Sequence, residues 1–333
     1  MFDTVCPSAD HEQKRFLWAV AGGKGGTGKT FIAANLGLQL SAYLDVTLVD
    51  ADLGSPNLHT FLGIKNRELT LSDFLYRRLQ LEQVASDTGH SKLRLISGSS
   101  ESLGLGNLQH FRKQRMLRQI RGLNSPITLL DIGAGTYFNC IDFFIIADLG
   151  ILVINPEPAS VENAYQFIRA ATLRLLESTI RKYRLQHLLE RVVESRNEVP
   201  RSIYGLLELV AKEDPSSADL LADELEAFRP CLIVNKVRKD DDIVLGRSVT
   251  DVVNKFLAVQ LHFVGAIPFD DAVDACLKRF SPYLMSHPYS QTTCAVKLIA
   301  ERLMTISRAG RRFIPTTDAS DEEATRTELL PSS

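Results

Sequence analysis

A glycine-rich run near the amino end of the chain has residue types that bind phosphate. It follows an apolar run, precedes a helical pattern, and fits the spacing G-x-x-x-x-G-K-[ST] with Gly23, Lys24, Gly25, Gly26, Thr27, Gly28, Lys29 and Thr30. Glycines carry no Cβ, so backbone N–H groups can converge on phosphate oxygens, and the following helix presents its N-terminal amides to the same anion. The pattern predicts that Lys29 contacts the β- and γ-phosphates of a nucleotide and that the Thr30 hydroxyl is a Mg²⁺ ligand.

Three aspartates stand at or near the ends of later apolar runs. Asp50 and Asp52 close one run, and Asp131 lies near the end of another. The carboxyl ends of parallel strands meet at the edge of the sheet where a phosphate loop lies, so Asp131 can hold Mg²⁺ through water. Alternate residues at a strand end face opposite sides, so Asp50 and Asp52 need not share one role.

Short apolar runs alternate with helical patterns along most of the chain. The expected strands are Phe16–Ala21, Val46–Asp50, Leu93–Ser97, Ile127–Ile132, Gly150–Asn155, Cys231–Asn235 and His262–Ile267. Each run is continuously apolar, which is typical of a parallel sheet covered on both faces. The expected helices include Thr30–Ala42, Arg112–Gly122, Val161–Arg196, Ile243–Val259 and Gln291–Arg312. This alternation predicts an α/β fold with a doubly wound, mainly parallel sheet.

One long segment interrupts the alternation. Between Thr172 and Phe228 no strand pattern appears, and Pro200 and Pro215 separate two shorter helical patterns. We therefore predict an all-helical insertion over residues 172–228 and favour a structural role for it over partner docking. The predicted organisation is an N-terminal tail over 1–15, a P-loop domain over 16–312, and a polar, mildly acidic, disordered tail over 313–333.

The composition narrows the classes of protein to consider. The 333-residue chain has a net charge of −2, which argues against general coating of nucleic acid. Its five cysteines lack metal-ligand spacing and favour a reducing compartment. Residues 1–15 lack the apolar core of a signal peptide, and the most apolar stretch, 141–154, is too short to span a bilayer. We expect a cytoplasmic protein whose membrane contact, if any, is peripheral.

A second lysine in the loop carries a family resemblance. Lys24 cannot easily reach its own phosphates alongside Lys29, and Lys-Gly-Gly-Thr-Gly-Lys-Thr resembles the deviant Walker A loop of the MinD/ParA ATPases, in the SIMIBI class of P-loop proteins. The resemblance implies ATP and Mg²⁺ as cofactors and an ATP-dependent homodimer in which Lys24 reaches the partner's nucleotide. It further implies that Asp50 lies near the Mg²⁺ and that Asp52 positions the attacking water.

Two further segments are similar to motifs of the same family. The segment Leu129–Gly135, which contains Asp131, looks like Walker B. The family places an adenine-contacting Asn where Asn235 stands and a base-flanking loop where Pro268 stands. Asn235 could equally be a turn residue or a helix cap. An Asn/Thr-Lys-x-Asp motif is absent, which argues against a guanine-specific site.

The subgroup and the partners follow from resemblance as well. The segment Pro156–Tyr165 looks most like that of the FlhG/FleN group, which regulates flagellar number and placement, with MinD and ParA as the alternatives. In place of the N-terminal motif by which that group engages a partner GTPase, the chain has only His11-Glu12-Gln13. An activator or SRP-type GTPase as protein partner, and DNA as ligand, are left open. Gln291–Arg312 is basic and amphipathic, and we favour core packing for it over contact with the inner face of the membrane.

Two functions of different class remain. The leading one is a Mg²⁺-ATP-dependent dimerising ATPase switch, with slow hydrolysis, in flagellar placement or in division-site or partition positioning. The alternative is a non-hydrolysing, nucleotide-bound adaptor whose helical insertion docks a protein partner. The presence of both Asp52 and Asp131 favours hydrolysis.

Overall fold

The computed structural model describes residues 15–52, 54–65, 69–77, 79–98, 110–135, 138–188 and 202–309. The N-terminal tail with His11-Glu12-Gln13, Pro200, and the expected tail over 313–333 lie outside the described residues. The boundaries of the predicted domain and insertion stay predictions.

The described residues form an eight-stranded sheet with the order β3-β4-β2-β5-β1-β6-β7-β8. The strands are β1 (Phe16–Ala21), β2 (Val46–Ala51), β3 (Ser86–Asp87), β4 (Leu93–Ile96), β5 (Ile127–Ile132), β6 (Leu149–Ile154), β7 (Cys231–Val237) and β8 (His262–Pro268). Within this described sheet, only the β3–β4 pair is antiparallel. The predicted doubly wound, mainly parallel α/β fold is confirmed.

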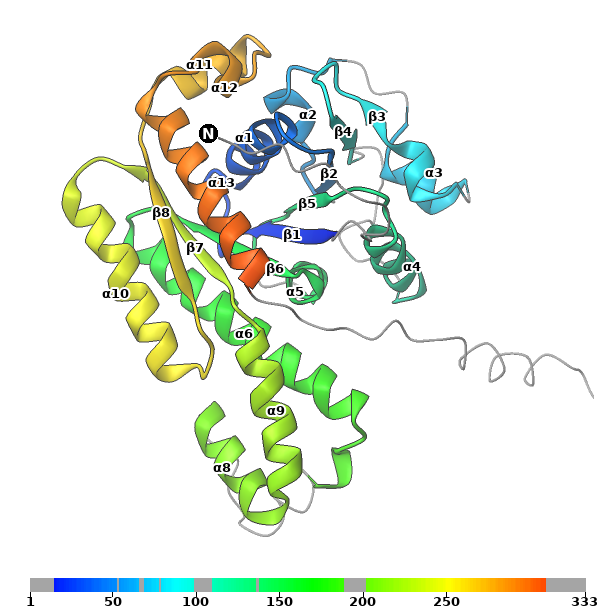
Figure 1. Ribbon diagram of the computed structural model, residues 1–333, viewed down its shortest axis with the longest axis vertical. Helices are drawn as coiled ribbons and strands as arrows, with labels where there is room; N and C mark the ends of the chain where they lie inside the picture. Colours follow the sequence, from blue (N-terminus) through cyan, green and yellow to red (C-terminus); the bar gives the residue numbers. More distant parts are fainter. Residues whose placement is uncertain are drawn as a thin grey trace, which may run out of the picture.

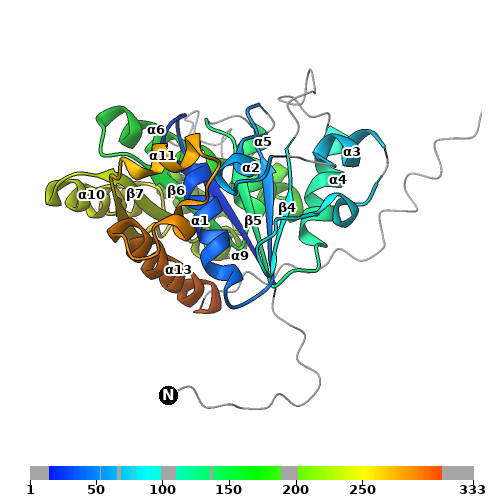
Figure 2. The ribbon, with the colours of Figure 1, turned by 90° about the horizontal axis from the view of Figure 1, so that it is seen from above.

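Helices cover both faces of this sheet (Figures 1 and 2). They are α1 (Lys29–Ser41), α2 (Leu58–Phe61), α3 (Leu71–Tyr76), α4 (His110–Arg121), α5 (Phe138–Ile146), α6 (Pro158–Lys182), α8 (Ile203–Glu213), α9 (Pro215–Ala227), α10 (Asp240–Phe256), α11 (Ala272–Lys278), α12 (Tyr283–Ser286) and α13 (Gln291–Ala309), with a 3₁₀ turn at Leu81–Val84. Alternate residues of β1 enter two separate cores: Leu17 and Ala19 pack with α4, α5 and α6, whereas Trp18 and Val20 pack with α1 and α13. This alternation on a central strand is the reason that its sequence is apolar throughout.

The helix expected over Val161–Arg196 has the wrong bounds. The observed helix α6 begins at Pro158, whose fixed φ suits a first helical position, and ends at Lys182. Arg184 then takes a left-handed φ of 57°, which breaks the helix. Residue 172 lies inside α6, so the helical segment continues directly from the crossover helix between β6 and β7.

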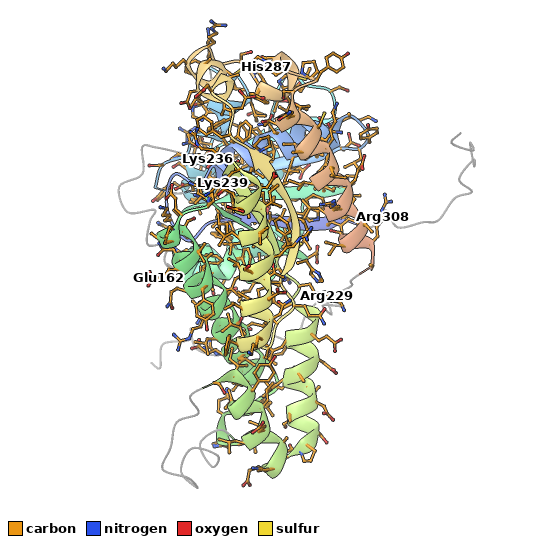
Figure 3. All side chains as sticks on the ribbon, turned by 90° about the vertical axis from the view of Figure 1, so that its left-hand side faces the viewer. Glu162, Arg229, Lys236, Lys239, His287 and Arg308 are labelled. Atoms are coloured by element: carbon orange, nitrogen blue, oxygen red, sulfur yellow. The ribbon has the colours of Figure 1, made fainter. Side chains whose placement is uncertain are left out.

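Helices α8 and α9 extend the molecule beyond one end of the sheet (Figures 1 and 3). They pack on each other, and α9 packs on α6. The ammonium of Lys182 on α6 lies 2.8 Å from a carboxylate oxygen of Glu224 on α9. The predicted pair of short helical segments after α6 is therefore present.

Helix α5 was not predicted because its sequence is apolar on nearly every side. Its one acidic side chain, Asp142, is buried and accepts hydrogen bonds from Lys113 on α4 and from Arg174 on α6, the latter at 2.8 Å from Nε. These contacts fix α5, which follows the β5 loop, between its two neighbouring helices.

The apolar face of α13 packs against α1 and β8, with Val296, Ile299 and Leu303 buried. Core packing of the helix expected over Gln291–Arg312 is therefore confirmed for its described part. Of the helices that the structure describes, none combines the length and the apolar character needed to cross a membrane.

Candidate nucleotide site

The glycine-rich loop joins β1 to α1 at the carboxyl edge of the sheet. Gly26 and Gly28 have φ values of 80° and 90°, in the left-handed region where a side chain would be strained. Gly28 stands at the N-cap of α1, and no side chain caps that end. A Cβ on Gly28 would also lie 2.2 Å from the amide nitrogen of Asn235. An anion bound at this loop would meet the N-terminal amides of α1, and that contact stays a prediction.

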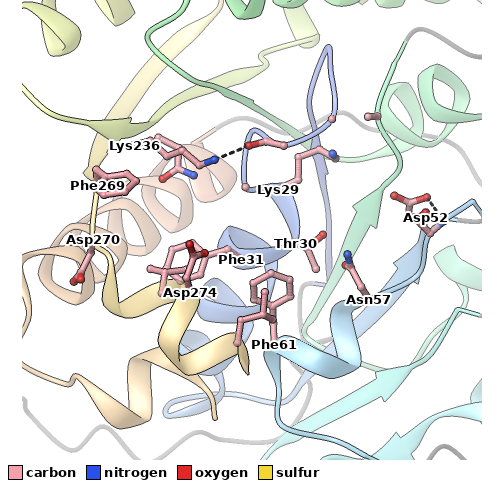
Figure 4. A pocket seen from close by; sticks show the side chains of 18 of the residues that line it. Lys29, Thr30, Phe31, Asp52, Asn57, Phe61, Lys236, Phe269, Asp270 and Asp274 are labelled. Carbon is pink, nitrogen blue, oxygen red and sulfur yellow. Dashed lines mark hydrogen bonds between the residues drawn. The ribbon is translucent and has the colours of Figure 1, made fainter. Parts of the chain in front are cut away.

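A cavity of about 680 Å³ opens beside this loop (Figure 4). One part of its lining is polar and includes Lys29, Thr30 and Asp52. Another part is apolar, with Phe31, Phe61, Pro268, Phe269, Val273 and Leu277. The volume falls in the range of small-molecule and cofactor sites. A polar end next to a phosphate loop and an apolar end suited to a base are the two halves of a nucleotide site.

Two carboxylates face each other across adjacent strands at the polar end. Asp50 on β2 is in register with Asp131 on β5, and both side chains are buried. Asp50 accepts hydrogen bonds from the N–H groups of Leu58, at 3.0 Å, and Asp52, at 3.3 Å. Burial, with the Asp131 charge, raises the pKa of Asp50 well above its ordinary value. Asp50 thus also anchors the start of α2, a structural role that its sequence position did not reveal.

The carboxylate of Asp131 differs from that of Asp50 in its hydrogen bonding. Neither of its carboxylate oxygens has a hydrogen-bond partner among the described residues. Burial raises its pKa to about 7, against an opposing effect of the nearby Thr30 hydroxyl and Lys29 ammonium. A buried carboxylate without a partner, beside a hydroxyl, fits the ligand set of a hydrated Mg²⁺ ion. The residues present therefore fit Mg²⁺, with Thr30 and Asp131 as the groups that would hold it.

Asp52 is held from one side only. Its Oδ1 accepts the N–H groups of Gly54 at 3.1 Å and Ser55 at 3.0 Å. Its side chain lines the cavity, beside Gly133, where a Cβ would come within 3.2 Å of Oδ1. Among the described residues no hydrogen bond is found to its second oxygen, and the positioning of water by Asp52 stays a prediction.

Lys24 does not line the cavity. Its ammonium lies 2.6 Å from an oxygen of Glu157, the residue before α6. Gly23 and Thr27 are also outside the lining, whereas Gly25, Gly26, Gly28, Lys29 and Thr30 are part of it. Lys29 therefore lines the cavity and Lys24 does not, and the predicted role of Lys24 at a partner's nucleotide stays a prediction.

Asn235 and Pro268 are brought together at the cavity wall by the ends of β7 and β8. The amide nitrogen of Asn235 donates to the Thr27 carbonyl at 2.8 Å, so this side chain supports the loop itself. Its contact with adenine stays a prediction, in which the carbonyl oxygen and the second N–H of the amide are left for the base.

Several cavity residues were missed by sequence reasoning. Lys236 has a left-handed φ of 60° and donates to the Gly26 carbonyl at 2.8 Å (Figure 4). Phe269 is covered by the Arg238 guanidinium, 3.6 Å from the ring centre. Phe31 and Phe61 make an edge-to-face pair. Two of them had a local signal, since Lys236 directly follows Asn235 and Phe269 directly follows Pro268 in the segment that resembles the family's base-flanking loop.

A loop that presents helix amides, a lysine and a hydroxyl, facing an unpartnered buried carboxylate on a neighbouring parallel strand, defines a P-loop nucleotide-binding protein. A comparison with family models agrees: the model described as the CobQ/CobB/MinD/ParA nucleotide binding domain matches residues 18–283. The chain belongs to this MinD/ParA-type family of P-loop ATPases.

Relatives and solved structures give the same result. The antiactivator FleN of Pseudomonas aeruginosa is 27% identical over 289 residues, covering 86% of this chain and 85% of FleN. A chloroplastic MinD homolog of Arabidopsis thaliana, a septum site-determining protein, is 25% identical over 293 residues, covering 86% and 73% of the two chains. The fold is shared with MinD of Pyrococcus horikoshii complexed with Mg-ADP, with a TM-score of 0.59, 18% identity, and coverage of 90% and 99% of the two chains.

Proposed function

We propose that this chain is a Mg²⁺-ATP-dependent dimerising ATPase that acts as a switch in spatial regulation, in flagellar placement or in the positioning of division or partition. The observation that carries the proposal is the unpartnered, buried Asp131 beside Thr30 and the P-loop. The relatives support the process: FleN is named an antiactivator, and the MinD homolog is named for septum site determination.

The described residues supply the parts of an in-line hydrolysis. The loop amides and Lys29 bind and orient the phosphates, and a bound Mg²⁺ neutralises charge that develops on them. Thr30 and Asp131 would hold the ion, and Asp50 lies in register with Asp131 on the adjacent strand. Asp52, fixed by Gly54 and Ser55, orients the attacking water with its remaining oxygen.

Lys24 has a different role in the proposal. It lies outside the cavity of its own chain and is 31% exposed, so it is accessible to a second copy. We infer that it stabilises charge on the partner's nucleotide in an ATP-dependent homodimer, comparable to an arginine finger. The complex of MinC with MinD from Aquifex aeolicus, which shares the fold at a TM-score of 0.56 and 21% identity, supports a protein partner for the switch. A cytoplasmic location belongs to the same proposal.

Steady-state ATP turnover against protein concentration tests this function. Turnover per chain should rise with concentration in the wild type because the active species is a dimer. Asp52→Ala should lower turnover by about 100-fold or more while ATP still binds. Lys24→Ala should keep ATP binding and lose the dependence on concentration. A nucleotide-bound wild type without turnover at any concentration would instead favour the non-hydrolysing adaptor.

A further inference from the structure

Glu157 stands at a rigid corner between β6 and α6. Pro156 and Pro158 flank it, and Pro158 is the first residue of α6. Glu157 is the N-cap residue of that helix, yet its side chain does not cap it. The carboxylate instead turns to the P-loop, where it lies 2.6 Å from the Lys24 ammonium. The Glu157 side chain therefore contacts the P-loop and not the amides of its own helix.

The two partners are held at a fixed separation. A Cβ on Gly23 would lie 2.4 Å from the backbone carbonyl carbon of Asn163, in the second turn of α6. The start of the P-loop therefore lies directly against this helix, and only glycine permits that approach. Lys24 is the next residue along the loop, so the position of the backbone keeps its side chain within reach of Glu157.

The local charges favour the same pairing. Lys24 holds the pKa of the Glu157 carboxyl below its ordinary value, and Lys236 lowers it further. Lys236 in turn donates to the Gly26 carbonyl of the loop. Glu157 therefore lies near Lys24 and Lys236, and its carboxylate pairs with the lysine that the proposed dimer needs.

We propose that Glu157 is a positioning residue that holds Lys24 at its own P-loop until an ATP-bound second copy of the chain binds. Lys24 then leaves Glu157 and contacts the nucleotide of that copy. The inference rests on the proposed function, since it assumes that Lys24 acts on the partner's nucleotide. Dimer formation must then break one Lys24–Glu157 pair in each chain. The γ-phosphate in the partner replaces the carboxylate as the anion bound to Lys24. Because the Lys24–Glu157 pair must first break, it raises the protein concentration at which the homodimer forms.

The test compares Glu157→Gln with Glu162→Gln. Glu162 is an exposed residue of the same helix (Figure 3), and no ion pair is found for it among the described residues. The dissociation constant of the homodimer is measured by light scattering over a protein dilution series with Mg²⁺-AMPPNP. Because exposed pairs contribute modestly and two are broken per dimer, Glu157→Gln should lower that constant roughly three- to tenfold. Glu162→Gln should leave it unchanged.

A second variant separates charge from structure. Glu157→Asp keeps the charge on a shorter side chain and should fall between the wild type and Glu157→Gln. The thermal midpoints of nucleotide-free wild type and Glu157→Gln should match, since an exposed pair contributes little to folding.

The outcomes are distinguishable. An unchanged or weaker dimer in Glu157→Gln, beside a wild type that dimerises and a Lys24→Ala variant that does not, would overturn the restraint alone. A wild type that stays monomeric with Mg²⁺-AMPPNP would overturn the switch and the restraint together.

Discussion

The nucleotide site and the α8–α9 pair differ in whether their polar groups have hydrogen-bond partners. Beside the P-loop, the Asp131 carboxylate and the Thr27 hydroxyl are buried, and neither has a hydrogen-bond partner among the described residues. In the helical pair, Ser202 caps α8 and Asp214 caps α9. Among the described residues, none of the buried side-chain atoms that lack a partner lies on α8 or α9. Buried polar groups without hydrogen-bond partners lower the stability of a fold, so the groups beside the P-loop fit a ligand site. The polar groups that cap α8 and α9 need no ligand.

The comparison separates chemistry from folding stability. Changes at the cavity should alter pH dependence and nucleotide binding, and changes in the helical pair should alter the free energy of unfolding alone. The variants below test whether the two regions are independent of each other.

The largest expected effect is the pH dependence caused by Asp131. Its pKa is about 7 in the folded protein, against an ordinary value of 3.8, so the folded state holds this proton more tightly than the unfolded chain. The free energy of unfolding should therefore fall as pH rises from about 4 to about 7, by about 1.4 kcal/mol for each unit of pKa difference. Asp131→Asn should lose this part of the decline. Urea unfolding of nucleotide-free protein between these pH values measures it, and parallel pH profiles for the two proteins would contradict it.

A deletion in the core of the helical pair should come next. Leu221 on α9 is 1% exposed, and Leu221→Ala should lower the free energy of unfolding by about 2–4 kcal/mol. Its affinity for Mg²⁺-ATP should stay within about twofold of the wild type, measured by calorimetry, if the pair is independent of the cavity. Leu220, on the same helix and 37% exposed, is the matched control, and Leu220→Ala should cost well under 1 kcal/mol. A large loss of affinity in Leu221→Ala would show that the two regions are coupled.

The smallest effect concerns a helix cap. The Ser202 hydroxyl accepts the N–H of Gly205 at 3.0 Å, and Ser202→Ala should lower the free energy of unfolding by about 1 kcal/mol. Ser202→Asn keeps an acceptor and should restore most of it. Denaturant unfolding measures both variants, and equal losses in the two would show that the cap does not stabilise α8.

The sequence predicted the parts of the molecule that depend on local patterns. The P-loop, the aspartates at strand ends and the continuous apolar strands are each read within a few residues, and the parallel sheet then brings Asp50 and Asp131 together. The two-residue strand β3 was missed because it is short and polar, and α5 because it lacks a polar face. The Lys24–Glu157 pair joins residues that are far apart in the chain, and a local sequence pattern cannot predict such a contact.

The apolar wall of the cavity was harder to predict for the same reason. Phe61 is the last residue of α2 and Phe269 directly follows β8, so both reach the cavity only through the packing of elements that are far apart in the chain. Phe269 lies in the segment that resembles the family's base-flanking loop, whereas the sequence around Phe61 has no signature of base binding. Lys236 could have been found, since a lysine directly after a strand-ending Asn is adjacent to a residue already placed at the site.

The central claim is that ATP joins two copies of this chain. Light scattering of the wild type and Asp52→Ala, each with Mg²⁺-ATP, with Mg²⁺-ADP and without nucleotide, tests it most directly. The account predicts a dimer with ATP only, which persists longer in Asp52→Ala because hydrolysis no longer releases it. A mass that is the same in all three conditions for both proteins would contradict the switch.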